Sequence, residues 1–107
     1  MFSKQYRLPP GSFSQKPSIA ITSLFSLRYA PNKLLFNRYG FVISKRIDKR
    51  ATMRNHLKRK LRKILENEGA SLKQGYDMLF IIQKPFVEGQ EALGLLVKKV
   101  LGEEKLL

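Results

Sequence analysis

The stretch from Lys45 to Lys63 constrains this chain most, because it holds ten of the protein's 21 Lys and Arg residues and a single acid, Asp48. Drawn as a helix from about Lys49 onward, at 3.6 residues per turn, the stretch separates into two faces. The first face carries Met53, Leu57, Leu61 and Ile64, and roughly opposite lie Ala51, Asn55, Lys58, Arg59 and Arg62. The pattern predicts an amphipathic helix that packs on one side and presents cations on the other.

A basic helix face is often only a solvated surface, so this alternative has to be weighed. Like charges at i,i+3 and i,i+4 spacing cost a few tenths of a kcal/mol per pair, and almost no Glu is interleaved to relieve them. Arginine can also hold a phosphate with two parallel hydrogen bonds. We therefore expect an anionic partner. Asn55 is compatible with a water-facing position and with a base or sugar contact.

Length and charge narrow the class of protein. The 107 residues suffice for one domain, spanning 1–107, and 43% of them are hydrophobic. The net charge of +13 divides into +6 over residues 1–44, +9 over 45–63 and −2 over 64–107. Together with a pI near 10.4, this distribution indicates a nucleic-acid binder whose partner contacts the first two-thirds of the chain.

Several other classes are disfavoured by composition. No apolar run approaches the roughly 20 residues of a membrane-spanning helix, so we expect no membrane partner. The absence of Cys excludes a disulfide scaffold, a thiol nucleophile and a Cys-ligated zinc. The first residues lack the apolar core of a signal peptide, which makes the cytoplasm the expected location.

Local patterns predict an α+β order. Residues 1–18 form an irregular basic segment rich in Pro, Gly and Ser, and residues 45–67 form the basic loop and helix. Between them, alternation predicts a strand over 19–29 that turns at 30–33 and returns over 34–44 as an antiparallel arm. Asp48 is the expected N-cap of the helix. Residues 76–83 read as a central strand covered on both faces, and 88–101 as a second helix.

The sequence offers no protein-based nuclease site, which would need convergent carboxylates or a pair of histidines. His56 is the only histidine and lies inside the basic helix, where a surface or RNA-contacting role is expected. Asp77 is expected to make a turn or cap, and Glu66 and Glu68 to face solvent. We predict no catalytic residue and no metal ligand on the protein.

Aromatic residues in the acid-free N-terminal part are candidates for base stacking, which contributes about 1–3 kcal/mol per base. These residues are Tyr6, Phe13, Phe25 and Tyr29. For Phe25 and Tyr29, a place in the core is an equally good interpretation, because the alternation does not say which strand face is open.

Three ordered motifs resemble one family. Ala51, Arg54, Asn55, Lys58, Arg59 and Arg62 form A-x-x-R-N-x-x-K-R-x-x-R, preceded by GFVISKR at 40–46 and followed by GYDMLFII at 75–82. This set is similar to the bacterial ribonuclease P protein component and covers about residues 24–84. Lys63 stands where the family often has Glu. The N-terminal segment is shortened, and Phe13 can match only one of two phenylalanines that the family carries after an Arg-Leu pair like Arg7-Leu8.

The resemblance implies a fold like the second domain of ribosomal protein S5. That fold is a sandwich of a mixed β-sheet with helices and has a left-handed βαβ crossover, although the general rule would make the crossover right-handed. The N-terminal helix of the family is expected to be shortened or absent here.

The resemblance also implies a function. The chain would be the protein subunit of an endoribonuclease whose RNA carries the active site and removes the 5′ leader of precursor tRNA, with one protein per RNA. Magnesium would be held mainly by the RNA, with no cofactor on the protein alone. The implied catalytic-RNA contacts are Arg46, Arg50, Arg54, Asn55, Lys58, Arg59 and Arg62, and weaker leader candidates are Tyr6, Arg7, Phe13, Phe25, Tyr29 and Lys45. A ribosomal or general RNA-chaperone protein, and less so a DNA-binding module, remain the alternatives.

Overall fold

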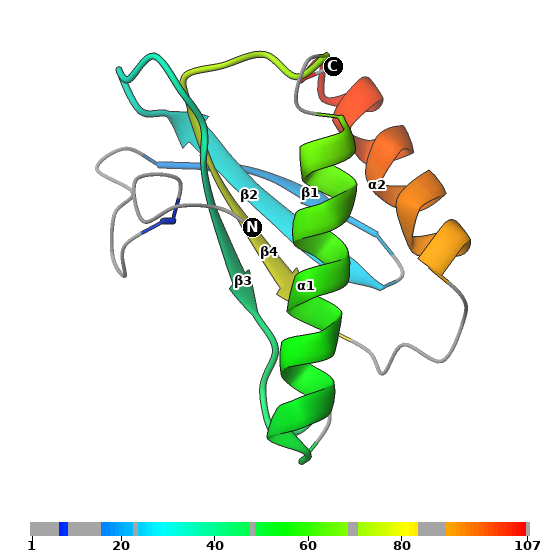
Figure 1. Ribbon diagram of the computed structural model, residues 1–107. Helices are drawn as coiled ribbons and strands as arrows, with labels where there is room; N and C mark the ends of the chain where they lie inside the picture. The colour runs from blue at the N-terminus through cyan, green and yellow to red at the C-terminus, as the bar shows by residue number, and fades with distance from the viewer. Residues whose placement is uncertain are drawn as a thin grey trace.

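The computed structural model describes residues 7–8, 16–22, 24–47, 49–68, 71–83 and 90–106. The elements, in chain order, are β1 (Ser18–Ile21), β2 (Phe25–Pro31), β3 (Arg38–Val42), α1 (Ala51–Asn67), β4 (Tyr76–Ile82) and α2 (Gln90–Glu103). The four strands form one mixed sheet in the order β1-β2-β4-β3, and both helices lie against the same face of it (Figure 1). The predicted single-domain α+β architecture is confirmed. The likeness to ribosomal protein S5, with its left-handed crossover, stays a prediction.

The apolar run at 76–82 forms β4, which is a central strand as predicted, antiparallel to β2 and parallel to β3. Alternate residues of a strand point to opposite faces. Met78, Phe80 and Ile82 are buried beneath the helices, whereas Leu79 and Ile81 point to the second face and are half-buried. The helices cover only one face of this strand, and the prediction that both faces are covered stays a prediction, because much of the remaining chain lies outside the described residues.

The predicted hairpin between 19–29 and 34–44 was also wrong. β4 lies between β2 and β3, so the two predicted arms never pair. The actual hairpin joins β1 to β2 at Thr22, whose hydroxyl oxygen accepts from the backbone N–H groups of Leu24 and Phe25 at 3.2 and 3.0 Å. This turn reverses the chain within the alternating segment that the sequence analysis treated as one strand.

The core lies between the sheet and the two helices. α1 contributes Leu61, Ile64 and Leu65, and α2 contributes Val97, Val100 and Leu101. The predicted apolar stripe of α1 therefore packs from Leu57 onward, with Leu57 itself partly buried against the core. Met53 keeps 40% of its surface exposed, because the first turns of α1 extend past the end of β4, as Figure 1 shows.

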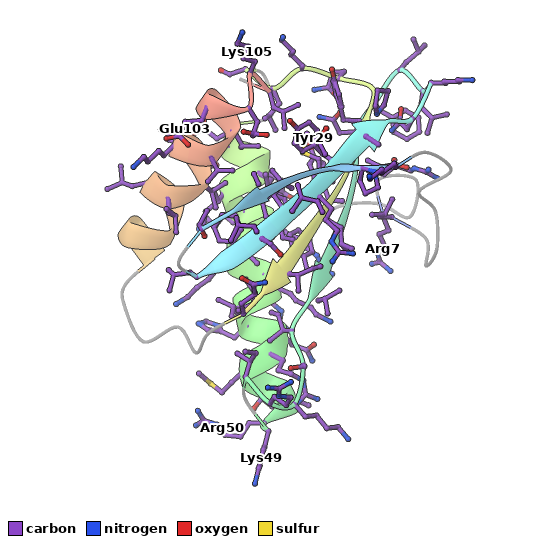
Figure 2. All side chains as sticks on the ribbon, turned by 180° about the vertical axis from the view of Figure 1, so that it is seen from behind. Arg7, Tyr29, Lys49, Arg50, Glu103 and Lys105 are labelled. Atoms are coloured by element: carbon purple, nitrogen blue, oxygen red, sulfur yellow. The ribbon has the colours of Figure 1, made fainter. Side chains whose placement is uncertain are left out.

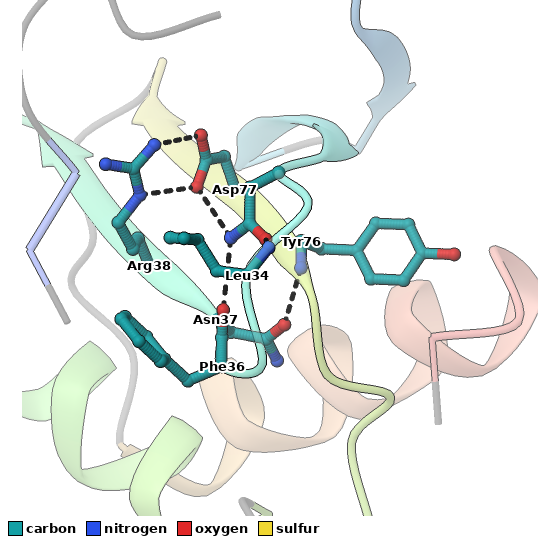
Figure 3. A network of polar contacts seen from close by, with 7 residues as sticks. Leu34, Phe36, Asn37, Arg38, Tyr76 and Asp77 are labelled. Atoms are coloured by element: carbon teal, nitrogen blue, oxygen red, sulfur yellow. Dashed lines mark hydrogen bonds and ion pairs between the residues drawn. The ribbon is translucent and has the colours of Figure 1, made fainter.

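One end of the sheet is fastened by a buried polar network (Figure 3). Asn37 is 1% exposed, and its side chain donates to the Tyr39 hydroxyl and the Lys73 carbonyl while accepting from the Tyr76 N–H. Asp77 is also buried and accepts two hydrogen bonds from Arg38, at 2.7 and 2.8 Å. The expected turn or cap is not what Asp77 makes: it lies within β4, where its carboxylate accepts from Arg38 and Asn32.

The C-terminus is fastened at the same end. After α2, Lys105 has a φ of 59°, its N–H donates to the Gly102 carbonyl, and the Leu106 N–H donates to the Leu101 carbonyl. These two bonds form a Schellman motif, which closes with contact between buried apolar residues. Leu106 is buried, and its carbonyl accepts from the Lys73 N–H at 2.8 Å.

The start of α1 differs from the prediction. The N-cap position is Arg50, whose side chain makes no capping hydrogen bond, and the first turn contains no acid. Asp48, the predicted N-cap, precedes that position by two residues, and its own structure lies outside the described residues. The helix therefore starts with a basic residue at the positive end of its dipole.

Candidate nucleic-acid interface

We call the segment from Lys45 to Lys60 the basic end; its described residues are 45–47 and 49–60. It forms one extremity of the molecule, where Figure 2 shows Lys49 and Arg50, while Tyr29, Glu103 and Lys105 lie at the other. Its charged and amide side chains are mostly exposed: Lys45, Arg46, Lys49, Arg50, Asn55 and Arg59 are exposed, and Arg54, Lys58 and Lys60 are half-buried. Because the first turns of α1 stand clear of the core, these side chains are accessible from several sides.

The cations of the basic end differ in their contacts with the described residues. Arg54 donates from Nη1 to the Lys49 carbonyl at 3.0 Å, which braces the loop before α1. Within the described residues, no carboxylate pairs with Arg46, Lys58 or Arg59. Charges that lack partners in the folded chain are available to phosphates.

A polar hollow of about 350 Å³ lies where the parallel strands β3 and β4 end. Its lining includes Ser44, Arg46, Ile47, Ile82 and Gln83. The hollow joins the basic end to the helix-free face of the sheet, because Ser44 and Gln83 continue the register of Val42 and Ile81 on that face.

We call the helix-free side of the sheet the open face. Its exposed residues include Ile19 and Ile21 of β1, Arg28 of β2 and Val42 of β3, and Ile21 is 76% exposed. Arg28 is paired in register with Ile19 on one side and with Leu79 on the other, so one cation lies among aliphatic side chains. The alternation over 19–29 did not indicate that these residues share an exposed face. The Thr22-Ser23 pair, a turn signal inside the alternation, would have exposed the change of face.

The structure places the candidate leader-binding residues in different environments. Phe25 is fully buried against Phe80, so its place is the core, and base stacking on its ring is ruled out. Tyr29 is on the helix side, where its hydroxyl donates to Glu104 at 2.7 Å. Burial, followed by this carboxylate, raises the pKa of Tyr29.

The remaining leader candidates lie elsewhere. Arg7 is exposed and forms a parallel bridge with Tyr39 on the outer edge of β3. Leu8 packs against Gly40, where an added Cβ would lie 3.2 Å from the Leu8 Cβ and 2.9 Å from the Leu79 Cδ1. Lys45 belongs to the basic end. Tyr6 and Phe13 lie outside the described residues, as does most of the N-terminal segment in which the family's first helix is expected to be shortened or absent.

The candidate side chains for acid-base or metal chemistry, namely His56, Asp77, Glu66 and Glu68, are either exposed or held in ion pairs. His56 is exposed on α1. The hydrogen bonds that Arg38 donates to Asp77 raise the pKa of Arg38. Glu68 is half-buried in an ion pair with Lys98 at 3.1 Å, so the prediction that Glu68 simply faces solvent was wrong. Among the described residues, no group of three His, Cys, Asp or Glu could hold a metal ion. None of the described helices has the length and apolar character needed to cross a membrane.

Solved structures with the same fold were found by comparison of coordinates. The RNase P protein of Staphylococcus aureus superposes with a TM-score of 0.83 over 94% of this chain and 96% of that chain, at 20% identity. The RNase P protein of Thermotoga maritima gives a TM-score of 0.64 over 82% of this chain and 80% of that chain, at 23% identity. At these identities the likeness establishes the fold.

Sequence comparisons establish the family. The family model of Ribonuclease P matches residues 12–100. The ribonuclease P protein component of Caldanaerobacter subterraneus is 37% identical over 83 residues, covering 72% of this chain and 71% of the relative. The corresponding protein of Dehalococcoides mccartyi is 36% identical over 88 residues, covering 81% and 71%. With the motif helix, the sheet order and these relatives in agreement, the chain belongs to the ribonuclease P protein family.

Proposed function

We propose that this chain is the protein subunit of ribonuclease P and that its basic end binds the catalytic RNA, which removes the 5′ leader from precursor tRNA. The observation that carries this proposal is that the first turns of α1 extend beyond the core and hold a cluster of cations at the molecular surface, of which Lys58 and Arg59 have no carboxylate partner among the described residues. The proposed contacts are Arg46, Arg50, Arg54, Asn55, Lys58 and Arg59; Arg62 is assigned a different role below.

In this proposal the protein contributes electrostatics and positioning. Lys and Arg side chains displace counterions from RNA phosphates and reduce the repulsion between catalytic RNA and substrate. The chemistry, including magnesium bound mainly by RNA, remains with the RNA, and the protein supplies no nucleophile or general base. We propose one protein per RNA and a cytoplasmic location.

The leader is proposed to follow the open face of the sheet. A single strand of RNA is held by a basic groove and by contacts with its bases. Arg28 provides a cation in the middle of this face, and the hollow at Ser44 and Gln83 leads from the face to Arg46, next to Lys45 in the chain. Arg7, and by position in the sequence Tyr6 and Phe13, would complete the outer edge.

Reconstitution tests the subunit role. The purified protein is added to a bacterial ribonuclease P RNA at a magnesium concentration too low for the RNA alone, and cleavage of precursor tRNA is measured. We expect the protein to restore cleavage, and the variant Lys58→Gln/Arg59→Gln to require a higher protein concentration. A protein that binds the RNA but never restores cleavage would instead be a general RNA-binding protein or chaperone.

The leader path has its own test, in the reconstituted enzyme. Wild type is expected to bind precursor tRNA more tightly than mature tRNA, and Arg28→Ser is expected to reduce this difference. Lys99→Ser removes one exposed cation from α2, on the helix side of the sheet, and serves as the control. Equal affinity of wild type for precursor and mature tRNA would contradict leader binding.

A further inference from the structure

Arg62 differs from the other cations of the motif helix in what it touches. Its guanidinium carbon lies 5.7 Å from the centre of the Phe41 ring, within the range of a cation–π contact, and the residue is half-buried. By contrast, Arg59, one turn earlier on the same side of α1, is exposed and has no carboxylate partner among the described residues.

The Phe41 ring packs against aromatic residues of the core. It stacks on Phe80 of β4, with centroids 5.8 Å apart and planes inclined by 20°, and Phe80 in turn contacts Phe25 of β2 at 5.7 Å. Phe41 and Phe80 are also register partners in the parallel pair of β3 and β4. Arg62 is therefore the outer end of a column of rings that runs through three strands.

The Arg62–Phe41 contact is directional, whereas the apolar packing that holds α1 on the sheet is not. α1 is held on the sheet by Leu61, Ile64 and Leu65, and burial of apolar surface does not by itself define the rotation of a helix about its axis. With a helix diameter of about 10–12 Å, a rotation of about 20° moves side chains on the surface by about 2 Å. That displacement is enough to break a charge-assisted hydrogen bond, which spans about 2.7–2.9 Å.

We propose that Arg62 is a positioning residue: its guanidinium, packed on Phe41, fixes the rotation of α1 so that Lys58 and Arg59 meet RNA phosphates. This inference rests on the proposed RNA-binding function of the basic end. It assigns Arg62 a role that its place in the motif alone would not suggest, since the motif groups it with the phosphate contacts.

The test measures the affinity of the full-length protein for ribonuclease P RNA at several salt concentrations. Arg62→Lys keeps the charge but lacks the planar group, Phe41→Leu removes the ring, and Phe41→Tyr keeps it as the matched control. We expect Arg62→Lys and Phe41→Leu each to weaken binding roughly three- to tenfold with an unchanged salt slope. Phe41→Tyr should bind the RNA like wild type. The double variant Phe41→Leu/Arg62→Lys should bind no more weakly than whichever of the two single variants has the lower affinity.

Other results would overturn the inference. If Phe41→Leu binds like wild type while Arg62→Gln lowers the slope of log affinity against log salt by about one, Arg62 is itself a phosphate contact. If the variants lower the melting temperature but leave the affinity unchanged, the column of rings is only structural. Arg59→Gln separates these cases from failure of the proposed function. A wild-type slope near zero, unaffected by Arg59→Gln, would refute the RNA interface and this inference with it.

Discussion

The two ends of this molecule differ in the environment of their polar and charged side chains. We call the end that contains Asn37, Asp77 and the Schellman motif after α2 the anchored end. There, buried polar groups are paired: Asn37 makes hydrogen bonds to three other residues through its side chain, and Asp77 is held by Arg38. At the basic end, cations are exposed, and α1 contributes no buried residue before Leu61.

The difference teaches where stability and binding come from. Residues of the anchored end and the core hold the fold, whereas the basic end concentrates like charges, which repel one another. A polyanion that binds this end would therefore stabilise the protein as it binds. Variants at the two ends should separate the free energy of unfolding from RNA affinity.

The largest expected contrast lies within α1 itself. Leu61→Ala removes a fully buried side chain from the second half of the helix and should reduce the free energy of unfolding by about 2–5 kcal/mol. Met53→Ala makes a similar change in the first half, where the side chain is 40% exposed, and should cost less than about 1 kcal/mol. Urea unfolding followed by circular dichroism measures both. Equal losses would show that the first half of α1 is packed after all.

A second contrast concerns the polar network of the anchored end. Asn37→Ala leaves the Tyr76 N–H and the Lys73 carbonyl without their partners in a buried site, which should cost about 2–4 kcal/mol. The nearby Leu35 is 94% exposed, so Leu35→Ala is the matched control and should change stability by less than about 0.5 kcal/mol. Thermal and urea unfolding should rank the two in this order. A stable Asn37→Ala protein would mean that the network does not anchor this end.

The smallest expected effect is a gain in stability at the anchored end. Lys105 occupies the left-handed position of the Schellman motif, with φ of 59°, where glycine is free of the Cβ penalty. Lys105→Gly should raise the free energy of unfolding by about 0.5–1 kcal/mol without affecting RNA affinity. Lys99→Gly, in the interior of α2, should have the opposite sign. Destabilisation by Lys105→Gly would indicate that the Lys105 side chain contributes more than its backbone strain costs.

The sequence predicted those parts of the fold that depend on local pattern. The continuous apolar run identified β4 as central, and the charge pattern located α1 and its exposed cations. The strand pairing could not be read in the same way, because the turn at 30–33 resembles a hairpin while β4, more than 40 residues later in the chain, takes the place beside β2. Pairing between distant segments depends on packing that no local window contains.

The candidate site, like the fold, was predictable only where it depends on local sequence pattern. Its basic helix followed from residue spacing, but the exposure of Met53 did not, because spacing says which side of a helix is apolar and not where the core ends. The open face was missed for a related reason. The turn at Thr22 places Ile19 and Ile21 on the face opposite Phe25 and Leu27, and an assumed continuous strand conceals this change.

The central claim is that the basic end, and not positive charge in general, binds RNA. Two triple variants that each remove three charges test it: Arg46→Gln/Lys58→Gln/Arg59→Gln at the basic end, and Lys73→Gln/Lys99→Gln/Lys105→Gln toward the anchored end. The measurement is the slope of log affinity for ribonuclease P RNA against log salt concentration. The basic-end variant should lower the slope by about two to three, at about 0.7–0.9 per phosphate contact, and the anchored-end variant should leave it unchanged. Equal reductions in the two slopes would contradict the account.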